Sequence, residues 1–264
     1  MNIIYTTSSK EFFPSAINMM NSIKPNIDED IDLVVFVIRT DKIDIDFKDN
    51  RIKIRYVDNE NLDNYESTIK EYGFVGSIAI LKISIAEKLL AEYDSVIYFD
   101  SDYRIYNKLD WLFKNIKSNN ISMILTPHCY TPRLFTRFPT DFDILNSGFY
   151  NAGFFAVNKQ GVKAIQWWKE MCRKHAHLGV AYPKQFAEQK WLTHIPLYFS
   201  GVISAPVEYG VAYYNIDDYK DFDMSKLVSI HFTGREVGSK YLSIHSTRLV
   251  SSYPKFKKLY ENYK

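Results

Sequence analysis

The sequence predicts an α/β fold, a single domain with a mostly parallel central sheet flanked by helices. Short apolar segments rich in β-favouring residues alternate with segments whose apolar residues recur at helical spacing. Such alternation is typical of strands joined by crossover helices. Residues 96–99 are apolar throughout, as strands buried on both faces of a parallel sheet are. The 264 residues suffice for one such domain with a large core.

The first elements have clear boundaries. Residues 2–6 predict a strand, and Ser8 and Glu11 stand three apart, the spacing of a capping box that opens a helix. Lys24-Pro25-Asn26 predicts the end of that helix. Further strands are expected at 32–38, 51–57, 95–99, 121–126, 151–158 and 227–233, and further helices at 77–91, 162–175, 186–192 and 254–263.

The remaining segments are less regular. The strand at 51–57 alternates charged and apolar side chains, which predicts a place nearer the edge of the sheet. Residues 58–71 are polar and irregular, and 111–113 begin a short amphipathic segment. Residues 131–148 form a long connection without clear periodicity, and long connections in compact domains are often functional.

Composition excludes several classes of protein. A net charge of +2 is too balanced to indicate a nucleic-acid partner. Cys129 and Cys172 are the two cysteines, so we expect no disulfide framework and a reducing compartment. No apolar run approaches the ~20 residues of a membrane span, and the first residues do not resemble a signal peptide. We therefore expect a soluble cytoplasmic protein. The 20 Tyr, 18 Phe and 4 Trp suit sugar or nucleobase surfaces, and a large core equally well.

Asp100 and Asp102 directly follow the central apolar strand. Their i, i+2 spacing lets both side chains point to the same side where the strand ends. In α/β sheets the ligand crevice lies outside the carboxyl ends of the strands. Two carboxylates there suit a hard divalent cation that shares its ligands with substrate phosphates. The alternative is a pair of solvated aspartates in a loop.

Four short motifs occur in order along the chain. The first motif spans residues 81–102 and ends in Asp100-Ser101-Asp102, and the second spans 150–158 and contains Asn151-Ala152-Gly153. The third spans 188–192 and begins with Glu188-Gln189, and the fourth runs from His231 to Gly234. Together they resemble the motifs of GT-A-fold glycosyltransferases, closest to the glycogenin-like family 8 and its bacterial relatives. The likeness extends from Asn2 to about Lys240.

The resemblance implies a fold and an activity. It implies one GT-A-like (Rossmann-like) domain over 1–264, with a nucleotide-binding half at 1–102, an acceptor and metal half at 103–240 and a helical tail at 241–264. The implied reaction moves a hexose from a nucleotide diphosphate sugar to a hydroxyl of a glycan or lipid-linked acceptor. We expect a UDP-linked donor and transfer with retention of configuration. The acceptor class suggested by the bacterial relatives is a capsular or lipopolysaccharide chain.

The resemblance also assigns roles to residues. Asp100, Asp102 and His231 would bind Mn²⁺ or Mg²⁺, and Glu188 and Gln189 would lie at the reacting carbon. Residues expected to bind the donor are Thr6, Thr7, Lys82, Asp100, Ser101, Asp102, Asn151, Ala152, Gly153, Gly234 and Lys240.

Each assignment has a plainer alternative. His231 could be a core histidine, Lys82 a solvated helix lysine, and Glu188 a residue that caps or salt-bridges its own helix. Asn151 could mark a bulge. Trp167 and Trp168, by contrast, predict packing in the core. His128 and Cys129 form no credible metal site, because neither has a partner at ligand spacing.

The sequence departs from the family pattern at two places. Tyr103 and Arg104 follow the two aspartates, where the family often has apolar residues. Val237 occupies the position of the family's late lysine, and Lys240 lies three residues further on. Whether Lys240, Arg235 or neither meets the leaving diphosphate is left open.

Two other functions compete with glycosyl transfer. A haloacid-dehalogenase-like phosphatase also has an apolar strand that ends in two aspartates, but that strand is normally the first in the chain. A sugar-nucleotide-binding protein without turnover would keep the same motifs. Lys255, Lys257 and Lys258 in the basic tail are typical of a solvated face; the alternative, if the acceptor is lipid-linked, is weak contact with the inner face of the membrane.

Overall fold

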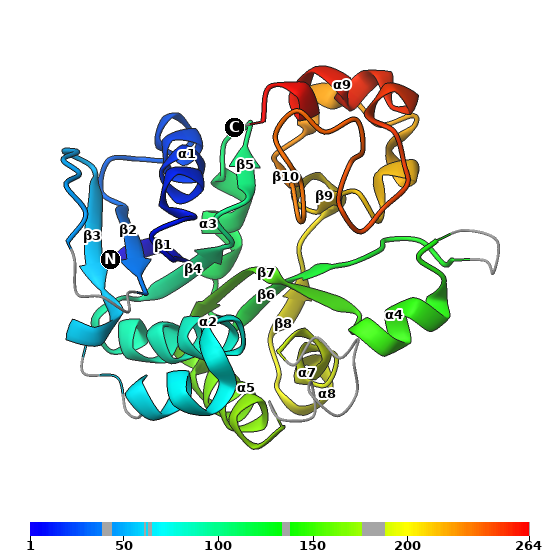
Figure 1. Ribbon diagram of the computed structural model, residues 1–264. Coiled ribbons are helices and arrows are strands. Elements are labelled where there is room, and N and C mark those ends of the chain that lie inside the picture. The colour runs from blue at the N-terminus through cyan, green and yellow to red at the C-terminus, as the bar shows by residue number, and fades with distance from the viewer. Residues whose placement is uncertain (39–43, 61, 63–64, 134–137, 176–187, 264) are drawn as a thin grey trace.

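The structure is a computed structural model that describes residues 1–38, 44–60, 62, 65–133, 138–175 and 188–263. Its centre is a seven-stranded sheet in the order β3-β2-β1-β4-β7-β6-β8, beside which lies a three-stranded sheet in the order β5-β10-β9 (Figure 1). The strands of the large sheet are β1 (Asn2–Ser8), β2 (Asp32–Val37), β3 (Ile52–Tyr56), β4 (Ser95–Phe99), β6 (Met123–Pro127), β7 (Tyr150–Asn158) and β8 (Val202–Ser204). Those of the small sheet are β5 (Tyr103–Ile105), β9 (Val211–Ala212) and β10 (Ser229–His231).

The large sheet is mostly parallel. β3, β2, β1 and β4 pair in parallel, as do β6 and β8, whereas β7 runs antiparallel to both β4 and β6. β3 lies at an edge, as its alternating charges predict. The α/β fold class predicted from the sequence is confirmed.

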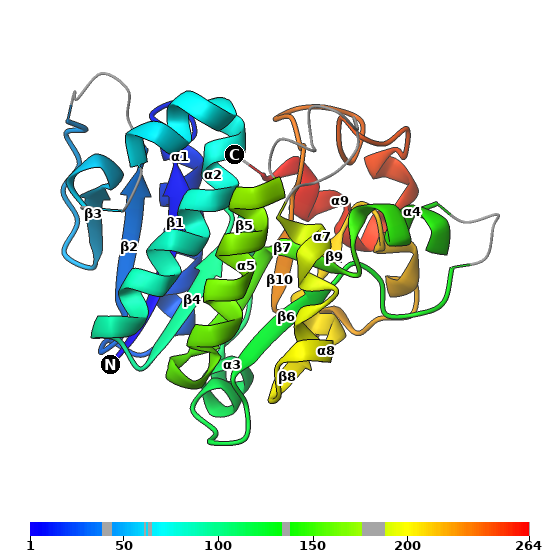
Figure 2. The same cartoon turned by 90° about the horizontal axis from the view of Figure 1, so that it is seen from below.

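Helices cover both faces of the large sheet (Figures 1 and 2). α2 (Tyr65–Glu92) and α5 (Val162–His175) pack on one face, where Trp168 is fully buried. α1 (Phe13–Ile23) and α3 (Asp110–Ile116) cover the other. Because successive strand residues alternate faces, apolar strands such as β4 contribute to both cores. The other α-helices within the described residues are α4 (Asp141–Ser147), α7 (Gln189–Leu192), α8 (Ile195–Tyr198) and α9 (Pro254–Glu261).

The small sheet has a core of its own. Strands β9 and β10 and helix α9 bury Val211, Ile230, Phe256 and Tyr260 together. β10 pairs antiparallel with β5, which follows β4 after a short turn. The small sheet therefore lies directly beyond the end of the central strand of the large one.

Several sequence predictions of elements need correction. No capping box forms at Ser8 and Glu11, because α1 begins at Phe13 and has no side-chain cap. The last strand, 229–231, is shorter than 227–233 and belongs to the small sheet. Within the long connection 131–148, the residues of α4 are helical, and 134–137 lie outside the described residues.

Helix α2 starts twelve residues earlier than predicted, inside the segment 58–71. Tyr65 and Ile69, four residues apart, pack against the core, and this packing stabilises the first turns of the helix despite their polar neighbours. The hydroxyl of Ser77 donates to the carbonyl of Thr68 at 3.0 Å, a contact that a straight helix cannot make across nine residues. The helix therefore bends between them, where it contains Gly73 and Gly76.

Candidate active site

The turn between β4 and β5 carries Asp100 and Asp102. The amide of Tyr103 donates to the carbonyl of Asp100 at 3.1 Å and closes the turn. Pairing of β10 with β5 sets His231 opposite Tyr103, and the amide of Phe232 donates to the carbonyl of Asp102 at 3.0 Å. His231, more than a hundred residues later in the chain, is thus held beside the two aspartates by backbone hydrogen bonds.

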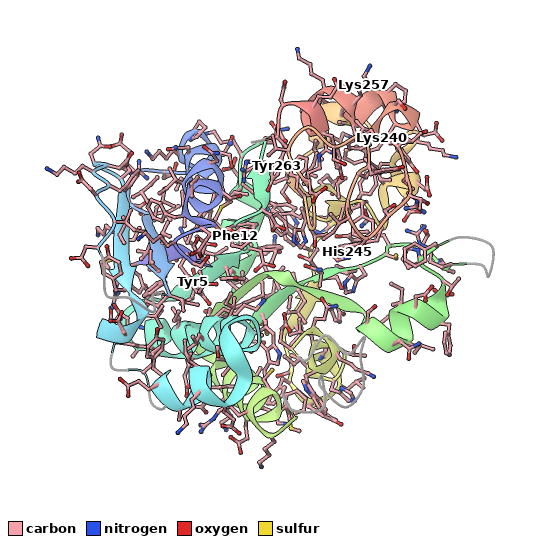
Figure 3. The ribbon with its side chains drawn as sticks, in the orientation of Figure 1. Tyr5, Phe12, Lys240, His245, Lys257 and Tyr263 are labelled. Carbon is pink, nitrogen blue, oxygen red and sulfur yellow. The ribbon has the colours of Figure 1, made fainter. Side chains whose placement is uncertain are left out.

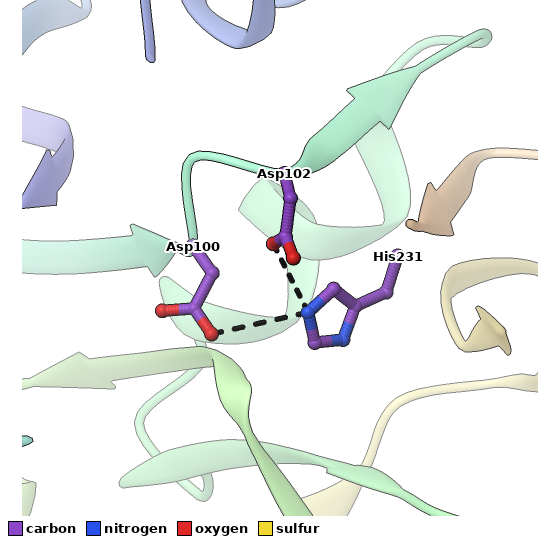
Figure 4. A group of neighbouring side chains, drawn as sticks. All are labelled: Asp100, Asp102 and His231. Carbon is purple, nitrogen blue, oxygen red and sulfur yellow. Dashed lines mark ion pairs between the residues drawn. The ribbon is translucent and has the colours of Figure 1, made fainter. Parts of the chain in front are cut away.

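Asp100, Asp102 and His231 form a cluster whose ligand atoms all lie within 4.8 Å of one another (Figure 4). His231 Nε2 lies 3.1 Å from Asp102 Oδ1 and 3.9 Å from Asp100 Oδ2. In an octahedral divalent ion with bonds of about 2.1 Å, neighbouring ligands lie roughly 3 Å apart and opposite ligands roughly 4.2 Å apart. The 3.1 Å and 3.9 Å spacings fall within this range.

The state of the buried oxygen supports the same interpretation. Asp102 Oδ1 is buried and faces His231 Nε2 at 3.1 Å, but no hydrogen bond of good geometry reaches it in the described part of the chain. A buried oxygen of this kind costs free energy unless something binds it. One nitrogen and two carboxylates form a donor set that Mn²⁺ and Mg²⁺ accept. The residues present therefore fit a divalent cation.

Gly153 makes room for this cluster. A Cβ at this position would lie 2.7 Å from His231 Cε1 and 2.8 Å from Asp100 Oδ2, closer than real Cβ atoms approach. It would also meet Asn151 Oδ1 at 2.7 Å, the atom that accepts a hydrogen bond from the Gly153 amide. The missing side chain of Gly153 leaves the space that the two ligand side chains occupy.

Lys82 connects the cluster to Glu188. Its side chain is 3% exposed, with Nζ 3.8 Å from Asp100 Oδ1 and 3.5 Å from Glu188 Oε1. Nζ also donates to the carbonyl of Ala152 at 3.0 Å. The lysine is therefore not a solvated helix residue. It lies between two carboxylates that belong to different motifs.

The charges of these groups depend on one another. Burial and the neighbouring Asp102 raise the pKa of Asp100, although Lys82 opposes the shift. Burial also disfavours the ionised form of Asp102, but His231 outweighs it and lowers the pKa of Asp102. Burial acts to lower the pKa of His231, but Asp102 and Asp100 outweigh it, so the pKa is raised. In Lys82 burial is likewise outweighed by Asp100 and Glu188, and its pKa is raised.

Tyr98 orients Asp100 from within β4. Its hydroxyl donates to Asp100 Oδ1 at 2.5 Å and lies 3.0 Å from Thr7 Oγ1 on β1. Lys82 also faces Oδ1, so Oδ2 is the oxygen of Asp100 that remains toward His231. Tyr98 was not predicted from the sequence. Its i−2 position before Asp100 is the signal that could have found it, since such residues share a face of a strand.

We expect Tyr98→Phe to weaken Mn²⁺ binding about ten-fold while the fold persists. The substitution removes the hydroxyl that fixes Asp100, and partners of this kind typically contribute ten-fold or more to metal affinity. Isothermal titration with Mn²⁺ measures the effect. Tyr5→Phe is the matched control, because the Tyr5 hydroxyl donates to the carbonyl of Lys82 and makes no hydrogen bond to Asp100. Equal Mn²⁺ affinities for Tyr98→Phe and the parent protein would contradict this role.

Asn151 is fixed by a chain of hydrogen bonds. His128 Nδ1 donates to the carbonyl of Gly148 at 2.8 Å, and Asn151 Nδ2 donates to His128 Nε2 at 3.3 Å. Burial lowers the pKa of His128 to about 4, which keeps its ring neutral and able to accept. His128 is thus a supporting residue next to the cluster, a role that its sequence context does not reveal.

Other predicted residues lie in various relations to the cluster. Thr6 is fully buried in β1, and Gln189 is buried in α7, where the carbonyl of Gln189 faces Gly148. Residues 186–187 of the predicted helix lie outside the described residues, and Glu188 lies at the N-cap of α7. Gly234 adopts φ +64°, and a Cβ there would meet Ser243 Oγ at 2.7 Å.

Arg235 and Lys240 are the two candidates for the cation that meets the leaving diphosphate. Within the described residues, neither makes an interaction with the Asp100–Asp102–His231 cluster. Arg235 donates to the carbonyls of Ser239, Tyr241 and Tyr260, so its guanidinium braces the loop after β10. Lys240 is exposed, with Nζ 5.2 Å from the centre of the Tyr241 ring. Figure 3 places Lys240 on the small-sheet side of the molecule, and His245 at the junction with the large sheet.

No family model matches the sequence, and no curated protein is significantly similar to it. Solved structures are similar over most of the chain. An active-site mutant of LgtC matches with a TM-score of 0.56 and 13% identity, covering 88% of this chain and 86% of that one. The galactosyltransferase LgtC with donor and acceptor sugar analogs matches with a TM-score of 0.54 and 12% identity over the same shares, 88% and 86%. Mouse xyloside xylosyltransferase 1 matches with a TM-score of 0.53 and 10% identity, covering 88% of this chain and 97% of that one.

The chain has a GT-A fold. This confirms the fold that the four motifs predict. At 10% to 13% identity the likeness concerns the fold, and it does not single out family 8. Within this GT-A fold the three-residue cluster lies beyond the carboxyl end of β4, next to Lys82 and Glu188. Among the described helices, none has both the length and the apolar character needed to cross a membrane.

Proposed function

We propose that this protein is a glycosyltransferase that moves a hexose from a nucleotide diphosphate sugar, most simply a UDP-sugar, to a hydroxyl of a glycan or lipid-linked acceptor. One observation carries the proposal: the Asp100–Asp102–His231 cluster, which fits a divalent cation, and the ion pair of buried Lys82 with Glu188 meet at the end of the central strand of a GT-A fold. The similar LgtC structure holds donor and acceptor sugar analogs, which supports a sugar donor and a sugar acceptor here.

The proposed donor site divides the work among the residues of the chain. Asp100, Asp102 and His231 would hold Mn²⁺ or Mg²⁺, which as a Lewis acid neutralises charge on the departing diphosphate. Lys82 keeps Asp100 and Glu188 apart and partly neutralised in their half-buried surroundings. We infer that residues 1–102 bind the nucleotide, and that 103–240 contribute the acceptor side and His231. Thr7, Ser101 and Asn151 are proposed donor contacts.

We propose that transfer proceeds with retention, with Glu188 near the reacting carbon. Its carboxylate is 3.5 Å from Lys82 and therefore lies toward the cluster rather than toward its own helix. A carboxylate there can stabilise an oxocarbenium-like centre or act as nucleophile. Gln189 offers only a polar contact.

Glu188→Gln should therefore lower the transfer rate about 100-fold, whereas Gln189→Ala should lower it less than ten-fold. Single-turnover rates with saturating donor measure this difference. In the same reactions, the anomeric coupling constant of the product reports its configuration. A β-linked product from an α-linked donor would contradict retention, and equal losses in the two variants would remove Glu188 from its assigned role.

The function is tested by offering purified protein a panel of nucleotide sugars with Mn²⁺, and again with EDTA. We expect slow hydrolysis of a UDP-hexose that the chelator abolishes. Release of phosphate without preference for the nucleotide would indicate a phosphatase. Binding of UDP without any hydrolysis or transfer would indicate a binding protein. Association with a membrane surface stays a prediction, which flotation with acidic lipid vesicles would check separately.

A further inference from the structure

Arg104 holds the turn of Asp100 and Asp102 from the side away from the cluster. It follows Tyr103 on β5, and because successive strand residues alternate faces, the two side chains point in opposite directions. Tyr103 stacks on the ring of His231, with centroids 4.3 Å apart and planes at 18°. Arg104 is 9% exposed, and its Nη1 donates to the carbonyls of Ser101 at 3.2 Å and Tyr103 at 2.6 Å.

Tyr263 closes this arrangement from the segment that follows α9. The guanidinium of Arg104 lies 4.7 Å from the centre of the Tyr263 ring, a cation–π distance. The same ring stacks on Phe232, with centroids 4.4 Å apart. Phe232 is the residue after His231, and its amide donates to the carbonyl of Asp102. Tyr263 therefore contacts β5, which follows the turn of the two aspartates, and the residue that follows His231.

Helix α1 supplies the third support. Ser15 Oγ donates to the carbonyl of Ser101 at 3.0 Å and lies 3.4 Å from the hydroxyl of Tyr263. The carbonyl of Ser15 accepts from Arg104 Nη1 at 3.4 Å. Figure 1 shows the last part of the chain beside α1 and β5, and Figure 3 shows Tyr263 in this position. Ser15, Arg104 and Tyr263 thus meet around the backbone of Ser101.

We propose that Arg104 and Tyr263 are positioning residues for the divalent cation: they fix the Asp100–Asp102 turn and β10, and so link the segment after α9 to metal affinity. Arg104 acts on the turn through the Ser101 carbonyl, and Tyr263 acts on β10 through Phe232. The consequence for metal binding rests on the proposed function, whereas the restraint on the turn does not.

The test compares Tyr263→Ala and Tyr263→Phe with the parent protein. Tyr263→Phe keeps the ring that contacts Arg104 and Phe232, so we expect parental behaviour. Tyr260→Ala is the matched control: Tyr260 lies in the same small-sheet core as Tyr263, packs on Phe232 with ring centroids 4.8 Å apart, and is 1% exposed. The Tyr260→Ala substitution removes a buried ring of the same size as Tyr263→Ala does. Among the described contacts of Tyr260, none is with Ser15 or Arg104. Arg104→Lys tests the guanidinium separately.

Two measurements are made on the whole chain. Hydrogen–deuterium exchange of the peptide over 100–105 reports the Tyr103 amide that closes the turn, and needs no metal. Electron paramagnetic resonance of free Mn²⁺ during titration, with and without UDP, reports affinity. We expect Tyr263→Ala to speed exchange of this peptide at least ten-fold and to weaken Mn²⁺ binding about ten-fold, with Arg104→Lys in the same direction. Tyr260→Ala should lower the melting temperature and leave both readouts near parental values.

Three results would count against the proposal. Unchanged exchange and affinity in Tyr263→Ala would overturn it while leaving the proposed function intact. Equal changes in Tyr260→Ala and Tyr263→Ala would assign the effect to lost packing. Failure of the parent protein to bind Mn²⁺, with or without UDP, would instead contradict the proposed function and the metal link. Exchange would then decide the restraint on the turn by itself.

Discussion

Asp102→Ala is expected to lose Mn²⁺-dependent donor turnover by about a thousand-fold while its melting temperature stays within a few degrees of the parent value. Removing one charged ligand from a metal site costs several kcal/mol of transition-state stabilisation, and about 1.4 kcal/mol corresponds to ten-fold in rate. The Asp102 side chain pairs with His231 at 3.1 Å inside the cluster, and its Oδ1 makes no further hydrogen bond within the described residues, so its loss removes little structural support elsewhere. Turnover with saturating Mn²⁺ and differential scanning fluorimetry measure the two effects.

Asp94→Ala provides the matched control for this substitution. Asp94 precedes the same strand, at the opposite end, and its exposed carboxylate pairs with the amino group of Met1 and with Lys159. Parental turnover is expected in this variant. Parental turnover in Asp102→Ala as well would contradict the metal hypothesis, because the activity would then not depend on this ligand.

Gly153→Ala is expected to lower donor turnover at least 100-fold with a modest loss of stability. The added methyl group would lie under 3 Å from His231 Cε1 and Asp100 Oδ2, which are the ends of side chains and can move aside. Their movement spares the fold but spoils the geometry of the ligands, and small displacements at a reacting centre cost about 100-fold. Mn²⁺ affinity should fall in parallel.

The control for crowding is Gly210→Ala. A Cβ at Gly210 would meet the hydroxyl of Tyr130 at 2.5 Å, again the end of a side chain, and no atom of the cluster is among its nearest contacts. It should keep full turnover. If Gly153→Ala kept its Mn²⁺ affinity and activity, the close packing of Gly153 against the ligands would have no functional meaning.

The sequence by itself predicted the layers of the fold, and it named the main residues of the candidate site. Apolar strands such as β4 are recognisable because both of their faces are buried. Asp100 and Asp102 are recognisable because a charged pair at the end of such a strand has few structural explanations. The four motifs added His231, Lys82 and Glu188. The structure brings His231 and Lys82 next to the aspartates, and Glu188 next to Lys82.

Only the tertiary structure decided how these residues meet. The pairing of β5 with β10 joins segments more than a hundred residues apart, and no local pattern specifies a partner at that separation. From the sequence alone, Lys82 is most simply interpreted as a solvated helix lysine, whereas in the folded chain it is buried between Asp100 and Glu188. The guanidinium of Arg235 is likewise directed away from the cluster by carbonyl groups that come close only in the folded chain. Side-chain type and local spacing are properties of the sequence, whereas burial and charge pairing arise from contacts between distant segments.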